Sequence, residues 1–489
     1  MKWILSAQLM LLLPLTVVAI EDIGDRRELF VDHRLIESLD GVELRMHEPQ
    51  DAGPAFYFDR PWEGRFSAYA TVLDDHGLFR MYYRGLPRGG GEVDAVTCYA
   101  ESPDGVNWIK PNLGLFEVAG TRDNNVVLAN NTFARNFSPF LDDRPGVPPE
   151  ERFKAIAGVE TKGLLAFVSE DGIRWRQWGE GYIFTNGMFD SHNVAFWSEH
   201  EQVYVCYFRT WTGEGFTGFR TVSRTTSTDF QHWSQPVSMS FGDTPMEHLY
   251  TNGTKPYFRA PHIYVGLAKR FLPEKAALSV NQTQALINNP ERGYDSSDAI
   301  LMTTRGGDRY DRTFMEAFIR PGNTAADWVA RDNTPALGLV PAANRRELYI
   351  YRMSHYAQDT AHLSRYVLRL DGFVSVHAPY AGGELVTKPF RFEGETLELN
   401  FESSAAGELR VELQTAHGVP LAGFAADECD LIFGNEISRE VTWRGDAALS
   451  DLVGRVVRMR VVMKDADLYS FRFRWGGANR RLAHRIGLI

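Results

Sequence analysis

The sequence has few of the residues that mark a disulfide-stabilised or metal-binding protein. It has three cysteines among 489 residues, Cys98, Cys206 and Cys429, each in an apolar, strand-like context. An odd number of cysteines without paired spacing predicts buried free thiols, and it excludes a disulfide framework and a cysteine metal site. The glycine-rich stretch Gly85 to Gly91 lacks the Gly-Lys-Ser/Thr of a phosphate-binding loop, so a rim loop is the better interpretation. No cofactor is expected.

The sequence also lacks an excess of positive charge and a second long apolar run. The formal net charge is -11 and the isoelectric point is near 5.7, which argues against a nucleic-acid partner. The one long apolar run covers Met1 to Ile20 and has the features of a secretory signal peptide over residues 1–19. We therefore predict a secreted or periplasmic protein without a membrane span.

Long amphipathic helical patterns are missing too, except for Pro273 to Ile287 within a loop. Instead, short β-branched and aromatic segments such as Ala68 to Leu73, Leu78 to Tyr83 and Ala95 to Ala100 alternate with turn signals. This pattern is typical of an antiparallel meander. The fold class is therefore all-β.

One short motif recurs through the first three quarters of the chain. Its Asp-Gly step favours a tight turn, its Ser and Asp side chains can accept or donate hydrogen bonds within the turn, and its aromatic residue can pack between neighbouring sheets. Copies start roughly 60 to 80 residues apart, the spacing of propeller blades with long loops. Five copies predict a five-bladed β-propeller. The copies are Ser102 to Trp108, Ser169 to Trp175 and Ser227 to Trp233, with weaker versions at Thr304 to Tyr310 and Arg369 to Phe373.

The pattern changes after the fifth copy. Leu397, Leu399 and Phe401 alternate with polar residues, and so do the apolar residues from Val457 to Trp475. Regularly spaced alternation without the blade motif predicts a β-sandwich. The predicted organisation is a signal peptide at 1–19, a propeller at 28–373, a sandwich at 374–475 and a tail at 476–489.

Propeller geometry sorts the candidate site residues. In a four-stranded blade, the segment before the innermost strand and the loop between the second and third strands share one side, and the Asp-Gly turns lie on the other. We therefore expect the side chains of the first group to meet near the axis, as in a carbohydrate site with hydroxyl-binding polar groups and aromatic rings. The candidates for binding substrate are Asn136, His192, Arg209, Glu247, Asn252, Tyr257 and Arg259.

Glycoside hydrolysis needs two carboxyl groups, and three are candidates. Asp190 precedes the innermost strand of the third blade, where Phe189 and Phe196 could desolvate it and make it a general acid. Glu63 is the first candidate for its partner and Asp59 the second. The alternatives are a turn-capping role for Asp190 and a salt bridge of Glu63 to Arg60 or Arg65.

Two other groups of residues allow more than one interpretation. His192, His248 and His262 lack the paired spacing of a zinc site, which favours hydrogen bonding over metal binding. Arg209 and Arg220 flank Trp211 and could bind a carboxylate or sulfate on a sugar, or pair with Glu214.

The blade order, the Ser-x-Asp-Gly-x-x-Trp motif and the trailing strands together resemble the secreted five-bladed propeller glycoside hydrolases of the families 32 and 43 type. The resemblance runs from about Glu28 to Trp475 and implies a glycosidase with a site in the propeller funnel. The chain departs from the catalytic motifs of family 32. It has Arg65-Phe66-Ser67-Ala68 in place of Asn-Asp-Pro-Asn and Asn136 in place of an aspartate, whereas Asp190 occupies a place comparable to the acid.

The sequence leaves three functions open. A secreted glycosidase acting on poly- or oligosaccharides is the first. A carbohydrate-binding propeller without catalysis is the second, because an amide at Asn136 cannot supply the charge of an aspartate. A polysaccharide lyase is the third, in which His192 or Tyr257 would abstract a proton beside a carboxylate that Arg259 neutralises.

Overall fold

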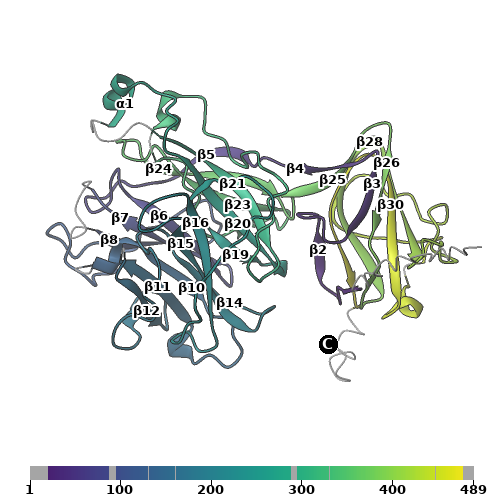
Figure 1. Cartoon of the computed structure of the whole chain (residues 1–489), viewed down its shortest axis with the longest axis horizontal. Helices are drawn as coiled ribbons and strands as arrows, with labels where there is room; N and C mark the ends of the chain where they lie inside the picture. Colours follow the sequence, from purple (N-terminus) through teal and green to yellow (C-terminus); the bar gives the residue numbers. More distant parts are fainter. Residues whose placement is uncertain are drawn as a thin grey trace, which may run out of the picture.

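The chain folds into two β lobes joined by a narrow connection (Figure 1). The computed structural model describes residues 20–87, 95–129, 132–159, 161–287, 295–329, 331–446 and 448–476. The predicted signal peptide and nearly all of the predicted C-terminal tail lie outside the described residues. Among the described residues, no helix is long and apolar enough to cross a membrane.

The larger lobe consists of five four-stranded antiparallel sheets, which are the five blades of a β-propeller. Blade I has β6 (Ala68–Asp75), β7 (Leu78–Gly85), β8 (Val96–Ser102) and β9 (Val126–Leu128); blade II has β10 (Phe137–Leu141), β11 (Phe153–Val159), β12 (Gly163–Ser169) and β13 (Arg176–Gln177). Blade III has β14 (Val194–Ser198), β15 (Val203–Trp211), β16 (Arg220–Ser227) and β17 (Val237–Ser238). Blade IV has β18 (His248–Thr251), β19 (Thr254–Tyr257), β20 (Ala260–Leu272) and β21 (Ser296–Thr304); blade V has β22 (Val340–Pro341), β23 (Glu347–Ser354), β24 (His362–Arg369) and β5 (Gln50–Tyr57). The helix α1 (Val280–Ile287) lies in the β20–β21 loop.

The ring closes between blade V and blade I. The outermost strand of blade V is β5, which comes from the N-terminal part of the chain and pairs with β24, with Tyr57 opposite His362. On the inner side, the N–H of Val72 donates to the carbonyl of Leu337 at 2.7 Å, which joins the innermost segments of the two blades. These contacts confirm the predicted five-bladed propeller.

The repeated motif forms the turn that follows the third strand of blades I to III. In blade II, the Asp171 carboxylate accepts the N–H groups of Ile173 and Arg174 at 2.8 Å, and the Ser169 hydroxyl accepts the N–H of Gly172 at 2.9 Å. The turn also contacts the preceding blade, because the Tyr82 hydroxyl of blade I donates to the Gly172 carbonyl at 2.8 Å. The motif therefore connects neighbouring blades, as the sequence predicted.

Glycine is required at Gly172 for two reasons. Its φ is +73°, and a Cβ atom there would lie 2.6 Å from the Tyr82 hydroxyl oxygen. We expect Gly172→Ala to lower the free energy of unfolding by about 2 kcal/mol, through left-handed backbone strain and loss of the contact between blades. Urea unfolding followed by tryptophan fluorescence measures this loss.

Gly179→Ala is the matched control for this prediction. Gly179 has a φ of +85°, and no atom lies within 4 Å of the position that a Cβ would occupy, so its substitution introduces backbone strain alone. Its expected cost is about 1 kcal/mol. Equal losses for the two variants would show that the contact between blades contributes nothing.

The smaller lobe is one connected ten-stranded sheet around its own core. Its two longest strands, β28 and β30, pair along nearly their whole length, and alternate residues such as Leu399, Val411 and Phe471 are fully buried. This confirms the predicted alternation; the arrangement as two packed sheets stays a prediction. The strands are β1 (Glu21–Asp22), β2 (Arg27–Leu29), β3 (Ile36–Asp40), β4 (Glu43–Met46), β25 (Val374–Ala378), β26 (Gly383–Thr387), β27 (Phe390–Arg391), β28 (Thr396–Thr415), β29 (Asn435–Glu440) and β30 (Val456–Arg474).

The strand pairing corrects the predicted boundary of the propeller at residue 28. Strands β1 to β4 all pair within the smaller lobe, for example β2 with β30 and β4 with β25. The propeller therefore begins at β5, and the N-terminal residues Glu21 to Met46 complete the other lobe. Local sequence could not show this, because the partners of β2 lie more than 400 residues away.

Asp371, in the fifth and weakest copy of the motif, links the two lobes. Its buried carboxylate accepts hydrogen bonds from Tyr257 at 2.7 Å, Arg259 at 3.0 Å and Ser470 at 2.7 Å, and it lies 3.6 Å from Arg27. Burial alone would raise the pKa of Asp371, but the charges of Arg259 and Arg27 lower it below its usual range.

Candidate functional site

The innermost strands of the five blades surround the propeller axis and define two mouths. We call the side on which these strands begin the upper mouth and the side on which they end the lower mouth. The predicted site belongs to the upper mouth. The repeated turns lie on the lower side, where the Asp171 carbonyl accepts a hydrogen bond from Arg80, the ion-pair partner of Asp75 at the end of β6.

Asp190 is the first candidate residue at the upper mouth. It lies just before β14, its side chain is 35 % exposed, and its carboxylate is ion-paired with Arg209 of β15. The guanidinium of Arg209 lies 5.2 Å from the ring centre of Tyr250 in β18. The structure therefore brings together a carboxylate, an arginine and an aromatic ring from blades III and IV.

The environment of Asp190 differs from the one expected for a general acid. Phe189 and Phe196, which the sequence suggested as desolvating neighbours, are buried in the cores of the blades. The carboxylate instead lies partly exposed and beside a guanidinium. An ion-paired carboxylate is suited to act as a base or nucleophile. The desolvation that these two rings were expected to provide is therefore absent at Asp190.

The His192 side chain, just before β14, connects blade III to blade I. Its Nε2 is 3.0 Å from the Thr71 hydroxyl of blade I, and its ring centre is 5.7 Å from that of Tyr69. Burial lowers the pKa of His192 to about 4, so the imidazole is neutral at neutral pH. This agrees with the predicted hydrogen-bonding role. Within the described ranges, no group of three or more His, Cys, Asp or Glu side chains could hold a metal ion.

Tyr69 is a site residue that the sequence did not reveal. It lies inside an ordinary strand pattern, yet its φ is +54°, a conformation that L-residues other than asparagine and aspartate rarely adopt. Burial raises its pKa, and the nearby Tyr250 and Asp190 contribute, so the hydroxyl stays protonated. Arg331, Asn333 and His355 at the same mouth also have positive φ.

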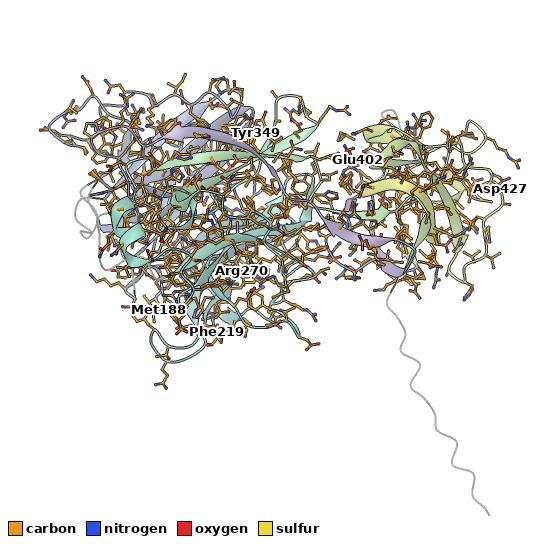
Figure 2. All side chains as sticks on the ribbon, turned by 90° about the horizontal axis from the view of Figure 1, so that it is seen from above. Met188, Phe219, Arg270, Tyr349, Glu402 and Asp427 are labelled. Atoms are coloured by element: carbon orange, nitrogen blue, oxygen red, sulfur yellow. The ribbon has the colours of Figure 1, made fainter. Side chains whose placement is uncertain are left out.

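The rim of the upper mouth is aromatic. Phe216 and Phe219 in the β15–β16 loop are 59% and 39% exposed. The Phe216 ring lies 5.9 Å from Trp211, and the Phe219 ring lies 4.9 Å from His248. Figure 2 shows Phe219 close to Met188 on the propeller, far from Glu402 and Asp427 in the smaller lobe. Exposed rings beside polar groups can stack against sugar rings.

Asn136 and Asn252 are both buried. Asn136 lies just before β10, the innermost strand of blade II, and Asn252 lies between β18 and β19, which together form the innermost strand of blade IV. Asn252 accepts the N–H of Thr254 at 3.0 Å, which is a structural turn contact. The Oδ1 of Asn136 is buried and has no hydrogen-bond partner among the described residues. Asn136 therefore has an unused acceptor at the start of blade II.

Glu63 and Asp59 bind Lys110 and are not among the described contacts of Asp190. Glu63 is fully buried and accepts hydrogen bonds from Tyr83, from the N–H of Arg60 and from Lys110, which is 2.7 Å away. Lys110 also binds the exposed Asp59 at 2.8 Å. Because both oxygens of Glu63 are engaged and enclosed, its role is the structural salt bridge, with Lys110 as the partner in place of Arg60 or Arg65.

Three other predicted site residues also lie in different networks. Glu247 pairs with Arg270 and Arg312 at 2.9 and 2.8 Å. Tyr257 and Arg259 bind Asp371 at the junction of the lobes, away from Asp190, and Tyr257 also lines a cavity at the lower mouth, so their role in binding substrate stays a prediction. The innermost strand of blade IV runs from the upper to the lower mouth, and Tyr257 lies at its far end.

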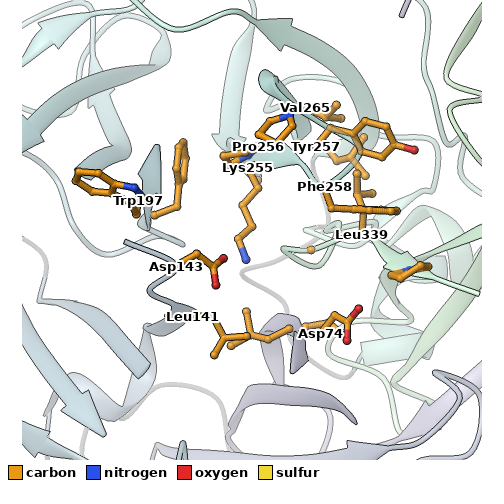
Figure 3. A pocket seen from close by; sticks show the side chains of 18 of the residues that line it. Asp74, Leu141, Asp143, Trp197, Lys255, Pro256, Tyr257, Phe258, Val265 and Leu339 are labelled. Carbon is orange, nitrogen blue, oxygen red and sulfur yellow. The ribbon is translucent and has the colours of Figure 1, made fainter. Parts of the chain in front are cut away.

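A cavity of about 490 Å³ opens at the lower mouth and is lined by residues of all five innermost strands. Figure 3 shows the Lys255 side chain projecting into it, with the amine on the side of Asp143. Burial lowers the pKa of Lys255 to about 8, although the charge of Asp143 opposes the shift.

Comparison with known proteins finds no matching family model and no matching curated protein. Among solved structures, the chain is similar to an N-acetylgalactosamine deacetylase from F. plautii, determined with blood group B trisaccharide (TM-score 0.42, 12% identity, 68% of this chain and 96% of that chain). It is also similar to a putative glycoside hydrolase from Parabacteroides distasonis (0.40, 14%, 67% and 97%) and a glycosyl hydrolase from Bacteroides ovatus (0.39, 14%, 72% and 94%). The fold itself rests on this chain's own strand pairing.

Proposed function

We propose that this protein is a secreted glycoside hydrolase that cleaves glycosidic bonds in poly- or oligosaccharides at the upper mouth. The observation that carries the proposal is Asp190, a partly exposed carboxylate that Arg209 holds beside Tyr250, near the exposed rings of Phe216 and Phe219. Carboxylate chemistry beside stacking surfaces is what glycoside hydrolysis needs. The apolar N-terminal run supports secretion.

Asp295 is the second carboxylate in this proposal. It lies in the β20–β21 loop, is partly exposed, and accepts the N–H of Arg331 at 2.8 Å. Its charge acts on Lys269, whose amine lies 5.0 Å from the ring centre of Tyr250, the same ring that Arg209 contacts. In the proposed mechanism, Asp190 acts in its ionised form on water or on the anomeric carbon, and Asp295 protonates the leaving oxygen.

Asp332 is a less suitable proton donor although burial raises its pKa to about 6. Its carboxylate is fully buried and accepts the N–H groups of His355 and Tyr356 at 2.9 and 3.2 Å. Asp332 thus fixes the β23–β24 loop. It has no exposed surface with which to reach a glycan.

The products of a polysaccharide panel test the proposed reaction. We expect the secreted protein to release oligosaccharides whose masses include one added water for each bond cleaved. Products that carry an unsaturated sugar at the cleaved end, without added water, would instead indicate a lyase. Glycan binding without any product would favour the carbohydrate-binding propeller, which the amide of Asn136 supports. Absence of both binding and cleavage across neutral and charged glycans would contradict the proposal.

A further inference from the structure

The upper mouth contains a concentration of positive charge within an acidic protein. We call Arg84, Arg209, Arg220, Lys269 and Arg331 the cationic cluster. Its members lie around two tyrosines: Arg84 is 4.8 Å from the ring centre of Tyr69, and Arg209, Arg220 and Lys269 are 5.2, 5.8 and 5.0 Å from that of Tyr250. The Lys269 amine also donates to the Arg331 carbonyl. The formal net charge of the chain is -11, so this cluster is a local exception.

Acidic residues compensate only part of this charge. Arg209 pairs with Asp190, Lys269 is influenced by Asp295 and Asp332, and Asp295 also accepts the backbone N–H of Arg331 and acts on its charge. The Arg84 side chain binds the Phe66 carbonyl and the Tyr356 hydroxyl, which are neutral groups. In the described part of the chain, no carboxylate forms an ion pair with Arg84, Arg220 or Arg331. The sequence allowed Arg209 or Arg220 to pair with Glu214. The described contacts of these two arginines do not include Glu214.

The Arg220 guanidinium packs against two aromatic rings. Its guanidinium lies 4.3 Å from the ring centre of Trp211 and 4.7 Å from that of Phe271. Its Nε is buried without a hydrogen-bond partner in the described structure, and so is the Nε of Arg209, a residue that is only 5 % exposed. Buried donors without partners are costly unless a ligand satisfies them.

The guanidinium groups also repel one another. Burial lowers the pKa of Arg220, and the positive charges of Arg209 and Arg331 lower it further, whereas Tyr250 and Asp190 oppose the shift. An anion placed among these three groups would relieve the repulsion and accept hydrogen bonds. Guanidinium groups bind carboxylates and sulfates through paired N–H donors.

We propose that the cationic cluster binds an anionic group of the substrate glycan, either the carboxylate of a uronic acid or a sulfate ester, between Arg220 and Arg331. This inference rests on the proposed function for the location of the glycan. Stacking against Phe216 or Phe219 would orient the sugar, and the arginines would select its charge. Neutral glycans would leave the donors of Arg220 unsatisfied.

Direct binding measurements test this inference without relying on cleavage. The probes are an oligogalacturonide, a sulfated galactan oligosaccharide and a neutral galactan oligosaccharide of equal length, titrated calorimetrically at low temperature into the full-length mature protein. We expect the preferred anionic glycan to bind at least tenfold more tightly than the neutral one. Preference between the two anionic probes identifies the carboxylate or the sulfate as the recognised group.

Substitutions within the cluster provide the second arm. Arg220→Gln and Arg331→Gln should each weaken binding of the anionic glycan by about 10- to 100-fold and leave neutral glycan binding unchanged, because each removes a charged donor. Arg220→Lys, which keeps the charge but not the paired donors, should be intermediate. Arg174→Gln, on an exposed arginine of the lower-side turn in blade II, is the matched control and should have no effect.

The outcomes separate this inference from the proposed function. Tight anionic binding without cleavage would leave the inference intact and contradict the hydrolase. Cleavage of a neutral glycan, with equal affinities for neutral and charged probes, would overturn the inference and leave the hydrolase intact. Unchanged anionic affinity in both glutamine variants would also overturn it, and so would the absence of measurable binding to both anionic probes.

Discussion

Asp190→Asn is expected to lower kcat on the natural glycan by a factor of about 10²–10⁴. Asparagine keeps the size of the side chain and an acceptor for Arg209 but removes the negative charge. Because the side chain is 35 % exposed, we expect only a small change in thermal stability. Initial rates of reducing-sugar release, together with a thermal melt, provide the two readouts.

Chemical rescue distinguishes the roles of the two carboxylates. If Asp190 acts as base or nucleophile, azide should restore part of the activity of Asp190→Gly, whose truncated side chain leaves space for the anion, whereas a dinitrophenyl glycoside should not restore the activity of Asp190→Asn. Asp295→Asn should show the opposite behaviour, since a good leaving group needs little protonation. Rescue of Asp190→Asn by the dinitrophenyl glycoside would restore the sequence-based hypothesis that Asp190 is the acid.

Asp59→Asn is the control for these variants. Asp59 binds Lys110 and is largely exposed, and it is not among the described contacts of Asp190. It should retain full activity. Loss of activity in Asp59→Asn, with Asp190→Asn fully active, would contradict the proposed site. It would favour Asp59 and Glu63, which both bind Lys110, as the catalytic carboxylates.

Asp371→Asn is expected to have the largest effect on stability. The substitution removes the ion-pair partner of Arg259 and leaves Arg27 with Glu398 alone. Breaking a buried ion pair in this way typically costs about 3–5 kcal/mol. Urea unfolding at pH 7 measures the loss, and we expect the junction between the lobes to open before the blades unfold.

The pH dependence provides a second test of the junction. The pKa of Asp371 is lower in the folded protein than the usual aspartate value of about 4. Its contribution to the free energy of unfolding is therefore complete above pH about 4 and is lost as the pH falls through the pKa of the folded state. The wild-type protein should therefore lose more stability than Asp371→Asn between pH 5 and acid conditions. Asp427→Asn, at an exposed position of the smaller lobe, should follow the wild type at every pH.

The candidate site was predictable only in part. Asp190, His192 and Arg209 were identified because they precede or extend the strands of blade III, whose order the motif revealed. Tyr257 and Arg259 were misplaced because blade IV interrupts its innermost strand between β18 and β19, so the chain there has already reached the lower mouth. Lys269 was not considered, although a lysine within the apolar run of β20 is an unusual signal that could have revealed it.

The sequence by itself determined the blades, because a tight turn with left-handed backbone, its capping Ser and Asp side chains and its aromatic residue are local features that recur at a fixed spacing. It also determined the change of pattern after Asp371. Only the tertiary structure decided that Glu21 to Met46 complete the smaller lobe, that Lys110 binds Glu63, and that cationic side chains of blades III and IV meet around Tyr250. The physical reason is that these contacts join residues distant in sequence. Local pattern determines each strand and turn, whereas side chains from separate blades become neighbours only when the ring closes.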